Sequence, residues 1–199
     1  LSYDTTFLKL AGTYSLGDHV IYAGYEFEEY NVFNMFVQHS IGEYRFSSID
    51  AFEDGIANTI YYGNGAGTHN PADAAANFGY ATHTLYAQDE YYIYDMDMTI
   101  TYGLRYDWYS SSDEPRVNEN FVDRYGFANN TTFDGESLLQ PRVGINWNLT
   151  DNIELRGGVG LYSGGNPNVW LANGYQNDGI TQIQLRDFSG ESLFDKDIS

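Results

Sequence analysis

The sequence lacks cysteine and has few basic residues. Its 199 residues include no Cys, and 9 Lys and Arg stand against 28 Asp and Glu, which gives a formal net charge of -19. Without cysteine, the chain can form neither a disulfide framework nor a thiolate metal site. We expect no nucleic acid partner, because binding to phosphate groups requires a basic surface that so acidic a chain does not provide.

Long hydrophobic runs are also missing. No apolar stretch approaches the ~18 residues that indicate a transmembrane helix. Leu1-Ser2-Tyr3 has neither the basic start nor the apolar run of a signal peptide. A strand pattern begins almost at the first residue, and the chain stops in a polar stretch at 195–199. We therefore interpret residues 1–199 as one domain that is an internal piece of a larger protein.

Aromatic residues and glycine are frequent instead. The chain has 19 Tyr, 12 Phe, 3 Trp and 21 Gly, and 42% of its residues are hydrophobic. A disordered chain would have low hydrophobicity and few aromatic residues, so the composition argues against disorder. Many tyrosines and glycines together with strand patterns are typical of a membrane β-barrel with aromatic girdles.

We base the interpretation of the chain on the strand pattern of residues 138–162. Alternate positions are apolar, which places them on one face of a pleated strand. These positions are Leu139, Pro141, Val143, Ile145, Trp147, Leu149, Ile153, Leu155, Val159 and Leu161. The pattern predicts two strands joined by a three-residue turn at 150–152. In the predicted register Leu149 lies opposite Ile153 and Trp147 opposite Leu155, with Asn146 opposite Arg156 on the other face.

Four further segments alternate in the same way. They are residues 5–16, 19–30, 80–92 and 98–108. Short turns follow the first, third and fifth strands, whereas long segments follow the second, fourth and sixth, at 40–78, 110–137 and 163–199. Within the first long segment we expect a short helix near 47–55, with Ser48 as its N-cap, and a flexible loop at 61–67.

This organisation distinguishes a membrane barrel from a soluble sandwich. Long structureless loops argue against a compact soluble domain, while short periplasmic turns and long extracellular loops are typical of outer-membrane barrels. The polar carboxylate of Asp89 on the apolar face fits a barrel best if it lies near the membrane interface. We predict an all-β fold: an antiparallel transmembrane β-barrel segment of about six strands with long extracellular loops, surrounded by outer-membrane lipid.

Three segments carry a family resemblance. They are 85–91 (LYAQDEY), 101–107 (TYGLRYD) and 139–144 (LQPRVG). In this order they resemble the barrel of TonB-dependent outer-membrane receptors of Gram-negative bacteria, of the Oar-like type with a carboxypeptidase-regulatory-like domain. The resemblance implies a 22-stranded barrel, a separate plug domain, a TonB system that drives uptake, and a ligand that could be a siderophore, peptide, glycan or protein.

This chain departs from the family in containing neither the plug domain nor a TonB box. Its six predicted strands are also fewer than the ~8 of the smallest closed bacterial barrels. A structural or adhesive outer-membrane barrel without active transport is therefore the alternative, and a plug domain encoded upstream would decide between the two.

The sequence suggests binding residues but no enzyme. It contains no HExxH or GxSxG motif and its four histidines lack metal-ligand spacing, so we expect no catalytic set, metal or cofactor. On the polar face, Arg105, Arg142 and Arg156 could contact an anionic ligand or the plug, or could pair with Glu26, Glu28, Asp107 and Glu154. In the long loops, Tyr61, Tyr62 and Trp170 lie among many carboxylates, which indicates a ligand vestibule, carboxylates that bind divalent ions, or an exposed acidic surface that keeps the protein soluble.

Overall fold

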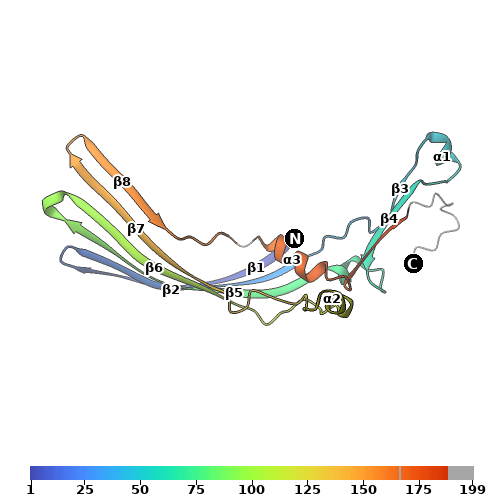
Figure 1. Ribbon diagram of the computed structural model, residues 1–199, viewed down its shortest axis with the longest axis horizontal. Coiled ribbons are helices and arrows are strands. Elements are labelled where there is room, and N and C mark those ends of the chain that lie inside the picture. Colours follow the sequence, from blue (N-terminus) through green and yellow to red (C-terminus); the bar gives the residue numbers. More distant parts are fainter. Residues whose placement is uncertain (166, 188–199) are drawn as a thin grey trace.

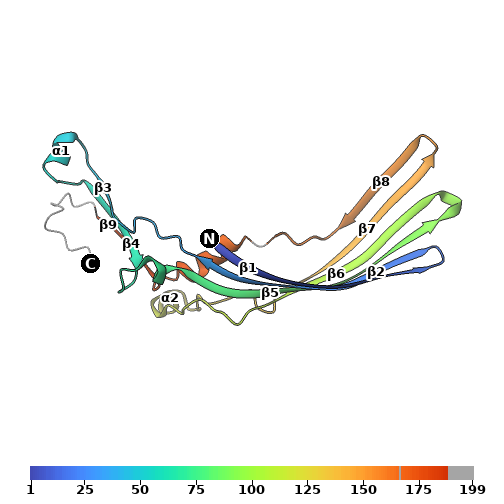
Figure 2. The same cartoon turned by 180° about the vertical axis from the view of Figure 1, so that it is seen from behind.

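The computed structural model describes residues 1–165 and 167–187, and its centre is a six-stranded antiparallel sheet in the order β1-β2-β5-β6-β7-β8. The strands are β1 Ser2–Leu16, β2 His19–Asn34, β5 Ala76–Ile93, β6 Met98–Ser110, β7 Ser137–Thr150 and β8 Ile153–Gly160. They form one curved wall (Figure 1; Figure 2). β1 and β8 are the edges of this sheet, so the wall is open.

The predicted two faces of the sheet are confirmed, because each strand pair keeps one register across the wall. Tyr25 lies opposite Leu85, which lies opposite Tyr106, which lies opposite Leu139. We call this the apolar face. Its side chains are open to the surroundings, with Leu10 73%, Leu104 53% and Val159 76% exposed. A soluble sandwich would bury such a surface, whereas a barrel presents it to lipid.

The opposite surface, which we call the polar face, holds the residues between these positions. It carries Lys9, Glu26, Tyr86, Arg105 and Arg142 on five successive strands of the wall. In the views of Figures 1 and 2, this face lies on the inner side of the curve, where α3 (Asn168–Gln176) packs against it. The curvature therefore agrees with a barrel whose polar side chains face the lumen.

The predicted β7–β8 hairpin is confirmed except at its turn. Trp147 lies opposite Leu155 and Asn146 opposite Arg156, as expected. The prediction that Leu149 pairs with Ile153 is wrong: Thr150 pairs with Ile153, and the register shifts between Asn148 and Thr150. Leu149 is the extra residue of a β-bulge, so the turn between the paired residues Thr150 and Ile153 contains two residues rather than the predicted three.

The short turns are staggered along the wall. Following the register across the wall, His19 at the start of β2 lies level with Ile145 on β7 and Gly157 on β8. Beyond that level β7 continues for five more residues to Thr150, and β8 begins four residues earlier, at Ile153. This stagger of about four to five residues over four strand-to-strand steps corresponds to a strand tilt of roughly 40°, with ~3.3 Å per residue and ~4.8 Å between strands. A transmembrane barrel has the same tilt.

Asp89 lies on the apolar face, as its parity predicts, but its charge is not isolated. The Tyr102 hydroxyl donates a 2.6 Å hydrogen bond to Asp89 Oδ2, and His19 Nδ1 lies 2.7 Å from the same oxygen. The His19 ring stacks on Tyr91 at 4.4 Å. These residues lie close to the short turns, where a polar cluster meets the interfacial region of the bilayer.

A second, three-stranded sheet projects from the end of the wall opposite the short turns (Figure 1). It consists of β3 Glu43–Arg45, β4 Thr59–Gly65 and β9 Gln182–Asp187, with α1 Ile49–Glu53 at its tip. The predicted helix is confirmed, and the Ser48 side chain caps it by accepting a 3.0 Å hydrogen bond from the Ala51 N–H.

The predicted flexible loop at 61–67 is wrong, because residues 61–65 belong to β4, which pairs with β9 over 60–65 and with β3 over 59–61. Its glycines serve close packing rather than flexibility. A Cβ on Gly63 would lie 2.5 Å from the Gln38 carbonyl oxygen, and one on Gly65 would lie 2.6 Å from the Asn70 carbonyl oxygen.

The main core lies where the wall meets the long segments. Val32, Ala76, Phe78, Tyr80 and Ala172 are buried together, so α3 covers the ends of β2 and β5 on the polar face. β2 and β5 each extend four residues further at this end than the alternation predicts, because the helix supplies an apolar partner there. The remaining short helices are η1 Pro71–Ala74, η2 Tyr94–Met96 and α2 Glu119–Tyr125. Among the described residues, no helix has the length and apolar character to cross a membrane.

Candidate functional site: a charged pocket on the polar face

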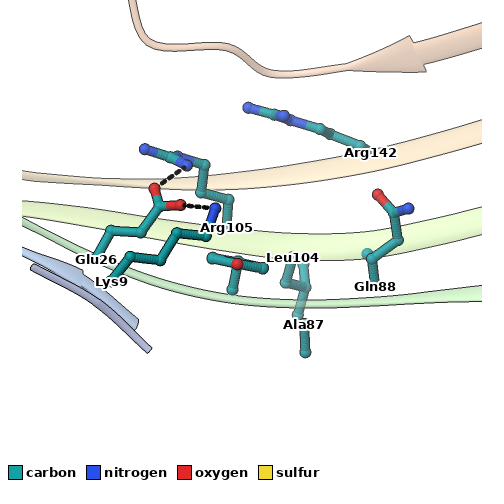
Figure 3. Close-up of a pocket in the computed structure, with 9 residues that line it drawn as sticks. Lys9, Glu26, Ala87, Gln88, Leu104, Arg105 and Arg142 are labelled. Carbon is teal, nitrogen blue, oxygen red and sulfur yellow. Dashed lines mark hydrogen bonds and ion pairs between the residues drawn. The ribbon is translucent and has the colours of Figure 1, made fainter. Parts of the chain in front are cut away.

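A pocket of about 240 Å³ opens on the polar face near the middle of the wall. Lys9, Glu26, Tyr86, Arg105 and Arg142 line it, one from each of β1, β2, β5, β6 and β7. Figure 3 shows Glu26 between Lys9 and Arg105, with Arg142 extending to one side. Three cations and one carboxylate therefore converge on this part of a strongly acidic chain.

Glu26 joins two of these cations. Its Oε1 lies 2.7 Å from Lys9 Nζ and its Oε2 lies 3.4 Å from Arg105 Nη1. Lys9 Nζ also lies 5.8 Å from the centre of the Tyr86 ring. The Tyr86 side chain extends over the neighbouring strand β2, where Gly24 lies opposite it. A Cβ on Gly24 would lie 2.5 Å from the Tyr86 hydroxyl oxygen, so the ring can take this position only because residue 24 is glycine.

Asp107 is the centre of a second network beside the pocket. Its side chain is buried and lies 2.9 Å from Arg105 Nε. Thr84, Gln140 and Ser163 donate hydrogen bonds to its two oxygens at 2.7, 2.5 and 3.0 Å. A buried carboxylate with this many donors is a rigid acceptor, because each donor would lose its partner if the group moved.

Gln140 extends this network to Arg142. It is fully buried, and its Oε1 accepts hydrogen bonds from Arg142 Nη2 at 3.0 Å and from the Ser163 N–H at 2.9 Å. The first residue of the third long segment is therefore attached to the wall at the same point that orients Arg142. The Arg142 guanidinium also lies 4.4 Å from the centre of the Tyr162 ring.

The three predicted arginines of the polar face differ in their partners. Arg105 pairs with Glu26 and Asp107, and Arg156 pairs with Glu154 at 2.7 Å, so the predicted mutual pairing describes both. Arg142 has no ion pair with any described residue. Arg156 lies on β8 outside the pocket, where 72% of its side chain is exposed. The structure thus brings Arg105 and Arg142 together and leaves Arg156 apart.

The three predicted loop aromatics also separate. Tyr61 lies in the second sheet, with the guanidinium carbons of Arg45 and Arg186 at 4.8 and 5.0 Å from its ring centre. Tyr62 is buried and accepts a 2.9 Å hydrogen bond from Asn64, which is a packing role. Trp170 is 73% exposed on α3.

Acidic side chains in the long segments accept hydrogen bonds from backbone N–H groups. Asp113 accepts a 2.6 Å hydrogen bond from the Gly79 N–H, and Asp134 accepts one of 2.8 Å from the Ser111 N–H. A hydrogen bond from Arg45 lowers the pKa of the Glu43 carboxyl.

Within residues 1–165 and 167–187, no group of three or more histidine and carboxylate side chains could hold a metal ion. Residues 166 and 188–199 of the third predicted long segment lie outside the described residues.

Several residues of the site escaped the prediction from sequence, chiefly Tyr86, Gln140 and Ser163. Tyr86 and Gln140 occupy polar-face positions on their strands, so their parity placed them beside Arg105 and Arg142. Their roles could not be seen because an uncharged side chain gives no sign of which cross-strand neighbour it will meet. Ser163 follows a strand end, and its contact with Asp107 depends on how the next segment folds back.

A family model described as "Outer membrane beta barrel domain" matches residues 5–190. The match covers the second sheet and the six strands of the wall, apart from the first three residues of β1. Neither the curated proteins nor the solved structures that were compared with the chain include a match.

Proposed function

The chain belongs to the outer membrane β-barrel family and its wall lies in the outer membrane, and from this premise we propose that it forms part of a TonB-dependent transporter or receptor that takes up an unidentified ligand. The polar face then lines the lumen and the apolar face meets lipid. The long segments are extracellular, and a plug domain and the TonB system are the partners.

The folding of the third long segment onto the polar face carries this proposal. Tyr175 of α3 stacks on Phe78 with ring centres 4.3 Å apart, and the Tyr80 hydroxyl donates a 2.7 Å hydrogen bond to Asn168. Ser163 holds the start of the segment against Asp107. An ordered extracellular segment packed against the lumenal wall suits a receptor, which must present a shaped surface to its ligand.

The paired charges of the wall support the same proposal. Lys9, Glu26, Arg105 and Asp107 form a continuous network that is buried at the Asp107 end and 48% exposed at the Lys9 end. Fixed polar groups in the lumen favour pairing with a folded plug, because less conformational freedom is lost when the two surfaces meet.

The test is binding of the full-length protein to the periplasmic domain of TonB. We expect the purified full-length protein to bind that domain, and a variant without its plug to lose this binding while the barrel stays folded. Absence of a plug, or a full-length protein that does not bind TonB, would contradict the proposal.

A structural or adhesive barrel is the alternative, and one observation favours it. The tip of the second sheet exposes apolar side chains around α1, with Ile49 76% and Phe52 64% exposed. Exposed apolar residues at the tip of a projecting extracellular arm are suited to contact with another surface. Failure to bind TonB, together with loss of cell adhesion when residues 46–56 are replaced by a Gly/Ser linker, would favour this function.

A further inference from the structure

We propose that Arg142 is an oxyanion-binding residue of the lumenal wall, and that the group it takes is a carboxylate or a phosphate. The inference goes beyond the proposed function because it concerns the wall itself, and it would hold in a barrel that works without TonB. It rests on the partners of Arg142, on its fixed orientation and on the space beside it.

Arg142 differs from the other cations of the polar face in its partners. Lys9, Arg105 and Arg156 each lie within 4 Å of a carboxylate, whereas Arg142 has no such partner among the described residues. A guanidinium has five N–H donors. In Arg142, one nitrogen donates to Gln140, and Nε is buried without an acceptor. Nη1 makes no hydrogen bond with a described residue, so this guanidinium keeps donors for an anion at Nη1, whereas Nε is too buried for a ligand to reach.

The guanidinium is held in place before any ligand arrives. Gln140, which accepts from it, is fully buried and itself donates to Asp107. The Tyr162 ring covers the guanidinium at 4.4 Å. An arginine fixed by a buried amide and an aromatic ring loses little conformational freedom on binding, which favours affinity.

The wall beside Arg142 is made of glycine. Gly103 and Gly160 are its direct cross-strand neighbours, and Gly144 and Gly158 form the next pair on the same face. We call these four residues the glycine trough. A Cβ on Gly144 would meet nothing nearer than 3.8 Å, so the space above this residue is open, whereas a Cβ on Gly103, Gly158 or Gly160 would lie 2.7 to 3.0 Å from its nearest neighbour. Glycine inside a strand often marks a position where a ligand or another backbone approaches closely.

An oxyanion fits this site better than a cation or a neutral group. Three of the four charged side chains that line the pocket are cationic, and the planar fork of arginine matches the two oxygens of a carboxylate or phosphate. The oxyanion could belong to a free ligand in the lumen or to an acidic side chain of a polypeptide that fills the barrel. The chemistry at Arg142 is the same in both cases.

The experiment uses the full-length protein in detergent and two probes, inorganic phosphate and 4-fluorobenzoate, with binding followed by ¹⁹F NMR and by the shift in Tm. If a free oxyanion is the ligand, we expect both probes to bind and R142Q to weaken binding at least tenfold. R156Q, which removes a lumenal arginine with its own carboxylate, is the matched control and should bind as wild type. G144V should also weaken binding, because it fills the trough where a side chain has room.

If a polypeptide side chain is the source, the wild-type protein will not bind the probes, and R142Q will lower the Tm. Salt screens the ion pair, so the Tm difference between wild type and R142Q should be smaller at high than at low NaCl, while the Tm difference between wild type and R156Q should change little. The proposal is overturned if R142Q binds the probes as wild type does, or if R142Q and R156Q are alike in both probe binding and salt-dependent Tm.

Discussion

Replacing Leu104 with arginine tests which face of the wall meets lipid. Leu104 is the seventh of the thirteen residues of β6 and lies on the apolar face between Ala87 and Pro141, with 53% of its side chain exposed. At roughly 40° tilt and ~3.3 Å per residue, β6 spans about 33 Å along the membrane normal, so Leu104 lies near the midplane.

The expected cost follows from this depth. An arginine at the midplane of a barrel's lipid face destabilises the folded protein by about 2–4 kcal/mol, and the effect fades toward the interfaces. From Leu104, a guanidinium would have to cross about half of the ~25 Å apolar band to reach water. Its cross-strand neighbours on the apolar face, Ala87 and Pro141, have side chains that offer it no hydrogen-bond acceptor.

The assay is a urea titration of the full-length protein folded into phosphatidylcholine vesicles, with heat-modifiable mobility on gels as the measure of folding. Leu104→Arg should lower the free energy of unfolding by about 2–4 kcal/mol. Thr101→Arg, three residues away on the polar face, should change it by no more than about 0.5 kcal/mol. Equal stability of Leu104→Arg and wild type, with destabilised Thr101→Arg, would refute the assignment of the faces.

Three further predictions concern the ends of the wall and its buried network. An epitope tag within 110–137 should be reached by antibody on intact cells, and a tag at Asp18 only after the outer membrane is opened; the reverse pattern would invert the topology. Asp107→Ala should destabilise the full-length protein by about 3–5 kcal/mol in the same urea titration, because it removes a buried carboxylate that pairs with a cation; a loss below about 1 kcal/mol would show that the network is not structural. Burial raises the pKa of the Tyr175 hydroxyl, so the packing of α3 should be fully stable below the usual tyrosine pKa near ~10 and weaken as pH rises above it; the Tm of the wild type should fall more between pH 9 and 11 than the Tm of Tyr175→Phe, and an equal fall in the two would contradict it.

The wall of the fold could be predicted from sequence because one physical rule controls it. Alternation has a period of two residues, so each strand assigns its side chains to two faces without knowledge of its neighbours. Leu104 and Arg105 illustrate this, since their faces follow from parity alone. The ends of β2 and β5 could not be placed, because Val32 and Phe78 are strand residues that owe their burial to a helix distant in sequence.

The second sheet and the site show the limits of the same rule. Gly63 and Gly65 suggested a flexible loop, but in the structure both are required by close backbone contacts. A sequence alone does not distinguish a glycine that provides flexibility from one that permits such a contact. Parity placed Arg105 and Arg142 on one face but could not show that Arg105 would find two carboxylates and Arg142 none among the described residues. Such pairing depends on the register between strands, which the alternation within a strand does not determine.

The central claim, that the wall spans the membrane with its polar face inward, is tested most directly by spin labels on β6. Residues 1–199 contain no cysteine, so a cysteine introduced at Ile100, Thr101, Leu104 or Arg105 is the single spin-label site within them, and any cysteine elsewhere in the full-length protein is replaced by serine. We predict that labels at Ile100 and Leu104 collide mainly with oxygen dissolved in lipid, and labels at Thr101 and Arg105 mainly with a water-soluble nickel reagent. Equal accessibility at all four positions, or the opposite alternation, would contradict the account.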